Sequence, residues 1–254
     1  MKKFFLFIIL AGTFLKADVN EIKVGIDEKL GRTLPLQSVL VTENGEYVKL
    51  GTILNKPTIL LFVYYECPGL CTPLMSEVAA KINELDMIPG KDYQVVSVSI
   101  DHEEDYKLAA KKKVNYMNLV KKPMTDSSWY FLTGDSVTVN SLADAAGFKF
   151  IKEEDEFIHA GTLIMVSPKG VITRYLLGTS FLPFDVKMGL LEASEGRITP
   201  TVAKMLKFCF SYDRESKTYV LNVTRIAGTG IIFLAVVFVI IISVKSKKRK
   251  DAIG

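Results

Sequence analysis

A single apolar segment followed at once by two cysteines places the strongest constraint on how this chain folds. Residues 58–65 form an uninterrupted run of apolar, aromatic and β-branched side chains. Such a run predicts a central strand that is buried on both faces of a sheet. Cys67 and Cys71 follow directly, and residues 73–85 then repeat apolar side chains at helical spacing. A cysteine pair between a buried strand and a helix predicts a thioredoxin-like fold.

The remaining apolar pattern predicts one α/β domain. Glu43-Asn44-Gly45 separates two short extended pieces and predicts a β-hairpin. Strands that alternate with helices predict a mixed sheet covered by helices. Further strands are expected at residues 93–100, 129–132, 162–166 and 171–177, and helices at 103–117, 137–146, 183–193 and 200–210. The predicted class is therefore α/β, with one thioredoxin-like domain over residues 18–225 and a C-terminal transmembrane helix.

Both ends of the chain carry targeting features. Two lysines, an apolar run too short to span a bilayer and Ala17 predict a signal peptide over residues 1–17. Residues 226–244 carry no charge and are long enough to form a transmembrane helix. The basic tail, residues 245–254, is expected to stay in the cytoplasm. The sequence thus predicts a domain, residues 18–225, anchored to a bacterial inner (cytoplasmic) membrane and facing the periplasm or the cell exterior.

The charge distribution excludes one class of partner. The net charge of +4 comes from lysines and arginines near the two ends, and residues 18–244 are slightly acidic. Because nucleic-acid binding needs a basic face on the folded domain, we expect no nucleic-acid partner. The basic run 111–113 is interpreted as a solvated helix face.

The two cysteines are the first candidates for chemistry. Cys67 and Cys71 are four positions apart, so both sulfurs can face one point at the start of a helix. Amide groups at a helix N-terminus lower the pKa of a thiol and make the thiolate accessible. From these residues alone a metal site, a redox pair, a structural disulfide and two buried inert thiols all remain open.

The chain has only two histidines, and one of them can complete a metal site. His159 precedes a predicted core strand that would lie beside the cysteine loop, so it can face the two sulfurs. Two thiolates and an imidazole suit Cu(I), and they accept Cu(II) with an added oxygen ligand; zinc fits the same set less specifically. His102 starts a helix and is expected to be exposed. Cys209 is interpreted as a core residue, with pairing between chains or a second metal site as alternatives.

The segment Tyr64-Tyr-Glu-Cys-Pro-Gly-Leu-Cys-Thr-Pro73 resembles the signature of the Sco/SenC family, copper-binding proteins of cytochrome c oxidase assembly. The resemblance spans most of residues 30–225 and includes Leu34-Pro-Leu, Ser97-Val-Ser-Ile-Asp101, His159, Ser167-Pro-Lys-Gly170, Arg174-Tyr-Leu-Leu-Gly178 and Glu192-Ala-Ser-Glu-Gly-Arg197. It implies a thioredoxin-like domain that binds copper, as Cu(I) or Cu(II), through Cys67, Cys71 and His159. It also implies delivery of copper to, or reduction of the copper-site thiols of, an oxidase subunit. Because cysteines outside the cytoplasm are prone to oxidation, a thiol reductant is expected as a second partner. Many members carry an acid just before the ligand histidine, where this chain has Ile158, and the acids at 153–156 are the candidates to replace it.

Two function classes compete for the same cysteines. The leading interpretation is a membrane-anchored copper chaperone, a binding and transfer protein rather than an enzyme. The alternative is a membrane-tethered thiol-disulfide oxidoreductase, in which one cysteine attacks a disulfide and the other resolves it. A thiol peroxidase is disfavoured because no threonine precedes Cys67 at the usual spacing. The three-residue spacer between the cysteines and the presence of His159 favour the chaperone.

Overall fold

The structure is a computed structural model that describes residues 24–67, 69–154 and 156–199, together with the backbone of two short strands. The chain divides into two compact units, and all the longer described segments belong to the first, residues 1–199. In the second unit, β12 (Phe210–Asp213) pairs antiparallel with β13 (Thr218–Leu221).

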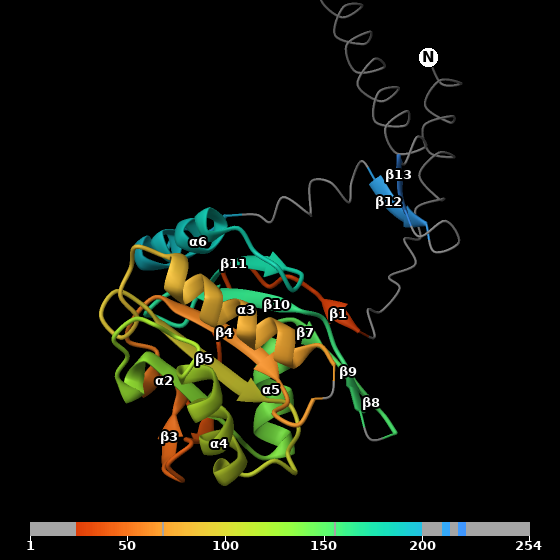
Figure 1. Ribbon diagram of the computed structural model, residues 1–254. Helices are drawn as coiled ribbons and strands as arrows, with labels where there is room; N and C mark the ends of the chain where they lie inside the picture. Colours follow the sequence, from red (N-terminus) through yellow and green to blue (C-terminus); the bar gives the residue numbers. More distant parts are fainter. Residues whose placement is uncertain (1–23, 68, 155, 200–209, 214–217, 222–254) are drawn as a thin grey trace, which may run out of the picture. The chain divides into compact units, whose positions relative to one another are not determined.

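A five-stranded sheet in the order β11-β10-β4-β5-β6 forms the centre of the first unit (Figure 1). Its three parallel strands are adjacent, and two antiparallel strands extend the sheet beyond β4. The strands are β4 (Thr58–Val63), β5 (Gln94–Ser99), β6 (Trp129–Leu132), β10 (Thr162–Val166) and β11 (Ile172–Leu177). Every residue of β4, β5 and β10 is buried, as expected for strands covered on both faces.

Three helices share one face of this sheet. In Figure 1, α3 (Cys71–Glu84) lies in front of the central strands, between α4 (Tyr106–Met117) and α6 (Pro183–Glu195). The buried residues of α3 recur at three- and four-residue intervals and give it one apolar face. The fourth long helix, α5 (Ser136–Ala145), packs beside β7 (Phe148–Lys149). The predicted mixed α/β, thioredoxin-like architecture is confirmed.

Short elements complete the domain. They are β1 (Gly25–Ile26), which pairs with β7; the hairpin of β2 (Val39–Val41) and β3 (Tyr47–Lys49); α2 (Leu50–Ile53); the 3-10 turn η2 (Asp126–Ser128); and the hairpin of β8 (Ile151–Glu153) and β9 (Glu156–Ile158). The β2–β3 hairpin turns at Glu43-Asn44-Gly45 as predicted, with Gly45 at a φ of 82°. The β8–β9 hairpin was not predicted from its acidic sequence.

Helix α4 begins later than predicted, because the residues before Tyr106 form the N-cap and a loop. The expected start was residue 103, but Asp105 is the N-cap and its carboxylate accepts a hydrogen bond from the Leu108 amide at 2.9 Å. An aspartate cap satisfies an amide that has no partner inside the helix. Residues 101–104 are therefore free to contact the segment that leads to Cys67.

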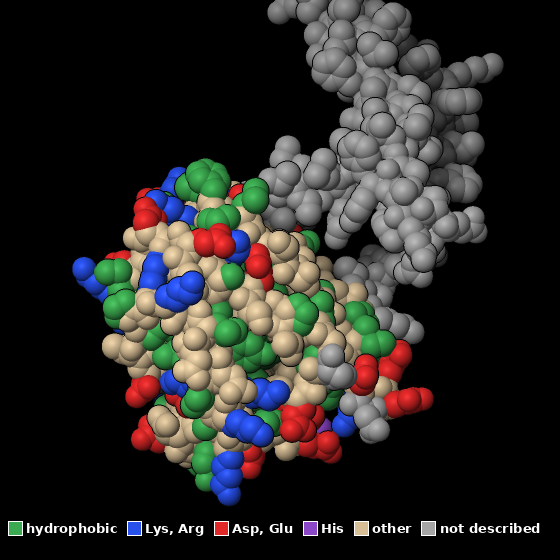
Figure 2. Space-filling view, viewed as in Figure 1, with side chains coloured by type: hydrophobic (Ala, Val, Ile, Leu, Met, Phe, Trp, Pro, Cys, Tyr) green, Lys and Arg blue, Asp and Glu red, His purple; other side chains and the backbone are tan. Residues whose placement is uncertain are grey.

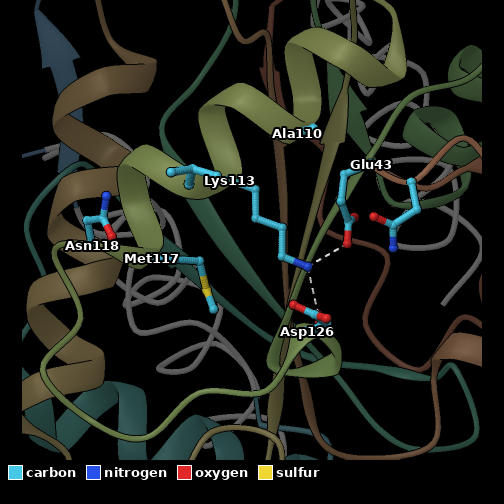
Figure 3. Close-up of a pocket in the computed structure, with 8 residues that line it drawn as sticks. Glu43, Ala110, Lys113, Met117, Asn118 and Asp126 are labelled. Carbon is cyan, nitrogen blue, oxygen red and sulfur yellow. Dashed lines mark hydrogen bonds and ion pairs between the residues drawn. The ribbon is translucent and has the colours of Figure 1, made fainter.

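The prediction that residues 111–113 form a solvated face is wrong for Lys113. Lys113 is buried, and Figure 3 shows it reaching from α4 to Glu43 and to the backbone carbonyl of Asp126. Its position explains the burial, because it lies four residues after Ala109 and three before Tyr116, on the buried stripe of the helix. A cavity of about 310 Å³ lies beside this ion pair.

Several predicted features lie outside the described residues. These are the signal peptide (1–17), the transmembrane helix (226–244), the basic tail, Cys209 and all of the helix expected at 200–210 except Phe210, which belongs to β12. Within the part of the chain that the structure describes, no helix is long and apolar enough to cross a bilayer. The membrane topology thus stays a prediction.

Candidate metal centre

The sheet topology brings the two halves of the candidate site together. Cys71 is the first residue of α3, and Cys67 lies in the loop between β4 and α3. His159 lies just after β9 and just before β10. Because β10 runs antiparallel to β4, with Ile164 opposite Leu60, the start of β10 lies beside the end of β4. His159 therefore faces the cysteine loop although it is 88 residues from Cys71.

Cys67, Cys71 and His159 form a compact cluster of buried donor atoms. The two sulfurs and one ring nitrogen all lie within 4.8 Å of one another. Cys71 Sγ is 3.2 Å from His159 Nε2, and the Cys71 backbone N–H donates to Cys67 Sγ at 3.3 Å. Neither cysteine is in a disulfide. The sequence predicted these three residues as one site, and the structure places them together.

A backbone carbonyl fixes which nitrogen of His159 is available to a metal. His159 Nδ1 lies 3.2 Å from the carbonyl oxygen of Ala160. Since a carbonyl only accepts hydrogen bonds, this contact requires the proton on Nδ1 and leaves the Nε2 lone pair directed at Cys71. Burial lowers the pKa of His159, although the Ala160 carbonyl opposes the shift, so the imidazole is held neutral. The described partner of Nδ1 is this carbonyl, and none of the described carboxylates at 153, 154 and 156 has a hydrogen bond to His159.

The two thiols have different acidities. Burial raises the pKa of Cys67, but hydrogen bonds from the Tyr64 hydroxyl and from the Cys71 amide outweigh burial, so its pKa is lowered overall. Burial raises the pKa of Cys71 well above its usual value, and the adjacent Cys67 sulfur adds to the shift. The expectation that the helix N-terminus makes both thiolates accessible is thus met only at Cys67. Cys71 is the deeper of the two, with 2% of its surface exposed.

Tyr64 is a site residue that the sequence analysis missed. Its hydroxyl donates to the Cys67 sulfur, and its ring packs against Phe157 and His159, with centroid distances of 5.4 and 6.0 Å. Phe148 also packs against the imidazole, with a centroid distance of 5.9 Å. Tyr64 directly follows β4, and the sequence analysis counted it in the apolar run of that strand. Nothing in that run indicates that its hydroxyl contacts Cys67.

The cluster opens to the surface through a cavity of about 400 Å³. Its lining comes from two segments, with Tyr64, Cys67 and Leu70 from the chain between β4 and α3, and Phe157, Ile158 and His159 from the end of the β8–β9 hairpin. Acidic side chains gather on the side of the molecule where this hairpin lies (Figure 2). The donors are therefore shielded from bulk water yet reachable by a small ion or a partner thiol.

His102 is not part of this cluster. It is exposed, as predicted, and lies in a different cavity beside Tyr47 and Tyr106. Among the described residues, Cys67, Cys71 and His159 form the single group of this kind close enough to hold a metal ion. Two thiols and a neutral imidazole at this separation suit a soft or borderline metal such as copper.

A model of the SCO1/SenC family matches residues 35–181, more than half of the chain. This chain belongs to the SCO1/SenC family. A Bacillus subtilis (strain 168) relative, described as an SCO1 protein homolog, is 26% identical over 151 residues, which are 56% of this chain and 73% of the relative.

Solved structures support the same fold. A protein from Aquifex aeolicus VF5, described as a candidate electron transfer protein, gives a TM-score of 0.60 at 24% identity and covers 66% of this chain and 95% of its own. Arabidopsis thaliana ScoI, whose structure has copper bound, gives a TM-score of 0.52 at 21% identity and covers 62% of this chain and 96% of its own. At these identities the structural likeness establishes the fold alone.

Proposed function

We propose that this SCO1/SenC family protein binds one copper ion through Cys67, Cys71 and His159. The observation that carries the proposal is the convergence of two sulfurs and one imidazole nitrogen within 4.8 Å in a buried cluster. Soft thiolates favour Cu(I), and the added imidazole nitrogen lets the same site accept Cu(II). The copper-bound ScoI structure supports the choice of metal.

The direct test is a copper titration of the full-length chain, purified in detergent with its thiols reduced. We expect one copper per chain in the unmodified protein and a large loss in Cys67→Ser and Cys71→Ser. His102→Ala is the matched control, because it removes the other histidine of the chain without touching the cluster. Equal copper uptake by the cysteine variants and the unmodified chain would exclude this site.

We further propose that the bound copper is cargo for the assembly of a cytochrome c oxidase. The protein would deliver the ion to an oxidase subunit or reduce the thiols of its copper site. Family membership supports this role, and so does the cavity that leaves the buried donors within reach of a partner. Pull-down of the chain from membranes with oxidase subunits, compared between the unmodified protein and Cys67→Ser, tests the exchange.

The thiol-disulfide oxidoreductase remains a second candidate, because the two thiols differ in acidity. Cys67, with its lowered pKa, would attack a substrate disulfide, and Cys71 would then displace the substrate thiol and leave a Cys67–Cys71 disulfide. A thiol reductant would have to restore the pair. Disulfide reduction that His159→Ala leaves unchanged, in a chain that takes up no copper, would favour this candidate over the chaperone.

The proposed topology places the copper site outside the cytoplasm of a bacterial cell. Residues 18–225 would be exported by the signal peptide, and residues 226–244 would anchor them to the inner membrane. Reporter fusions at Lys217 and Ile253 test this arrangement. We expect an exported reporter at Lys217 and a cytoplasmic one at Ile253, and a cytoplasmic reporter at Lys217 would contradict the topology.

A further inference from the structure

The three donor residues are not held in place equally. Cys71 begins helix α3, whose backbone hydrogen bonds fix its position. His159 sits between two strands, and β10 is paired on both sides. Cys67 lies in the loop between β4 and α3, outside both elements. The position of the Cys67 sulfur must therefore depend on contacts that the loop makes.

The loop before Cys67 is held by the carboxylate of Glu104. One carboxylate oxygen, Oε2, accepts the Tyr65 backbone N–H at 2.8 Å, and the other, Oε1, accepts the Glu66 backbone N–H at 2.8 Å. The Ser99 hydroxyl donates to Oε2 at 2.6 Å and fixes the carboxylate from the end of β5. Glu104, from the segment between β5 and the α4 cap, is thus bonded to the cysteine loop, and Ser99 at the end of β5 is bonded to Glu104.

These contacts lie beyond the end of the sheet, where strand pairing no longer holds the backbone. The last paired residues of β4 and β5 are Val63 and Ser99, so the amides of Tyr65 and Glu66 lie beyond the ladder. A carboxylate that accepts two successive amides fixes the orientation of both peptide planes, and charge-assisted hydrogen bonds are the stronger kind. The next residue is Cys67, so these planes set the direction from which its sulfur approaches Cys71 and His159.

We propose that Glu104 is a positioning residue for the metal centre. Its two amide contacts hold Cys67 at the distance from Cys71 and His159 that a single ion requires. Glu104 does not touch the ion, and it acts through the backbone of Tyr65 and Glu66. The inference rests on the proposed copper site, and it adds a residue outside the three donors.

The test is Glu104→Gln in the full-length chain. Glutamine keeps the size of the side chain but replaces one acceptor oxygen with an NH₂ group. This group is a donor, so it cannot accept a hydrogen bond from the backbone N–H that it faces. We expect copper affinity to fall roughly 10-fold, the range typical for groups that orient metal ligands. We also expect a weaker Cu(II)–thiolate absorption band, because the geometry at Cys67 changes. A residue that only stabilised the fold would not change this band in the folded protein.

Two further variants serve as a control and as a milder version of the same change. Glu103→Gln changes the neighbouring carboxylate, which is exposed and lies 3.4 Å from Lys152 Nζ without contacting the cysteine loop, so its copper band should match that of the unmodified chain. Ser99→Ala removes the hydroxyl that donates to Glu104 and that also accepts the Asp101 amide at 3.1 Å, and it should weaken the band in the same direction by less. If Glu104→Gln fails to fold, Ser99→Ala decides the question.

A second readout uses no metal and separates this inference from the proposed function. In a glutathione buffer the reduced pair is oxidised to the Cys67–Cys71 disulfide while one oxidised glutathione becomes two thiols. Loss of positioning should make this disulfide several-fold less favoured in Glu104→Gln than in Glu103→Gln, since preorganised groups lose less freedom when they bond. A chain that takes up no copper would refute the proposed function, and this equilibrium would still decide the role of Glu104. A disulfide equilibrium equal in the two variants would overturn the inference, and so would an unchanged copper band in both Glu104→Gln and Ser99→Ala.

Discussion

Lys113 and Glu43 form one buried polar cluster in this domain, and Cys67, Cys71 and His159 form another. In the first, the Lys113 ammonium donates to the Glu43 carboxylate and to the Asp126 carbonyl, and the second Glu43 oxygen accepts the Phe131 amide. Donors and acceptors thus face each other and connect α4, the β2–β3 turn and β6. Such a cluster holds elements together.

The second cluster is arranged differently, because its acceptors converge. Cys67 Sγ, Cys71 Sγ and the His159 Nε2 lone pair all face one small volume. The polar groups around them, the Tyr64 hydroxyl and the Cys71 amide, donate to a sulfur and so favour its negative charge. Burial alone therefore does not mark a functional group. What marks it is a set of electron donors that share one point.

The largest expected effect is a loss of stability in a variant that breaks the first cluster and leaves the second intact. Replacing one partner of a buried ion pair strands the other charge, so Lys113→Met should lower the free energy of unfolding by about 3–5 kcal/mol. Urea denaturation of the full-length chain measures this loss. Lys111→Met, at an exposed position of the same helix, is the control. A loss in Lys113→Met no larger than in Lys111→Met would show that the pair is not structural.

The next effect, a loss of copper affinity, is smaller in free energy and should arise from the second cluster and not from the first. Cys71→Ser replaces a soft sulfur with a hard oxygen, and we expect Cu(I) affinity to fall at least ~100-fold. Stability should change little, because serine is close in size. Competition with a Cu(I) chelator measures the affinity. If Lys113→Met, still folded, lost as much Cu(I) affinity as Cys71→Ser, the division of roles between the clusters would be wrong.

The two cysteines should also differ in reactivity toward iodoacetamide. The thiolate is the reacting species, and the pKa of Cys67 is lowered while that of Cys71 is raised by burial. At neutral pH we expect Cys67 in the copper-free, reduced chain to be alkylated at least ~10-fold faster than Cys71. Raising the pH should narrow this difference as Cys71 begins to ionise. Fragment mass spectrometry assigns the modified residue, and faster labelling of Cys71 would contradict the assigned acidities.

The smallest expected effect concerns Tyr64. Tyr64→Phe removes the hydroxyl that donates to Cys67 and keeps the ring beside Phe157 and His159. The pKa of Cys67 should rise, and its alkylation at neutral pH should slow about threefold, with stability nearly unchanged. Tyr106→Phe, at an exposed ring outside the site, is the control. Equal alkylation rates in these two variants would mean that the Tyr64 hydroxyl does not stabilise the Cys67 thiolate.

The secondary-structure elements predicted correctly from the sequence are those with a local signal. The apolar run of β4 and the helical spacing of α3 depend on residues close together in the chain, so both were predicted to within a few residues. The convergence of Cys67, Cys71 and His159 followed from the order of strands in a thioredoxin-like sheet. The resemblance to a known family supplied the metal.

Two of the missed features involve residues far apart in the sequence. The ion pair of Lys113 joins it to Glu43, 70 positions earlier in the chain. Glu104 accepts hydrogen bonds from backbone amides 38 and 39 positions away, and no periodic pattern in the sequence predicts such a contact. A helix-face analysis that included Lys113 with Ala109 and Tyr116 would have found its burial, but nothing local would have found the role of Glu104.

The most direct test of the account is the effect of His159→Ala on the two oxidation states of copper. Cys67 and Cys71 can hold Cu(I) between two sulfurs, whereas Cu(II) prefers additional nitrogen or oxygen ligands. The full-length His159→Ala chain should lose its Cu(II)–thiolate absorption band and most of its Cu(II) affinity, and should retain Cu(I) binding within about tenfold. His102→Ala should match the unmodified chain in both states. Unaltered Cu(II) binding in His159→Ala would contradict the three-residue copper site and leave the thiol-disulfide oxidoreductase as the better account.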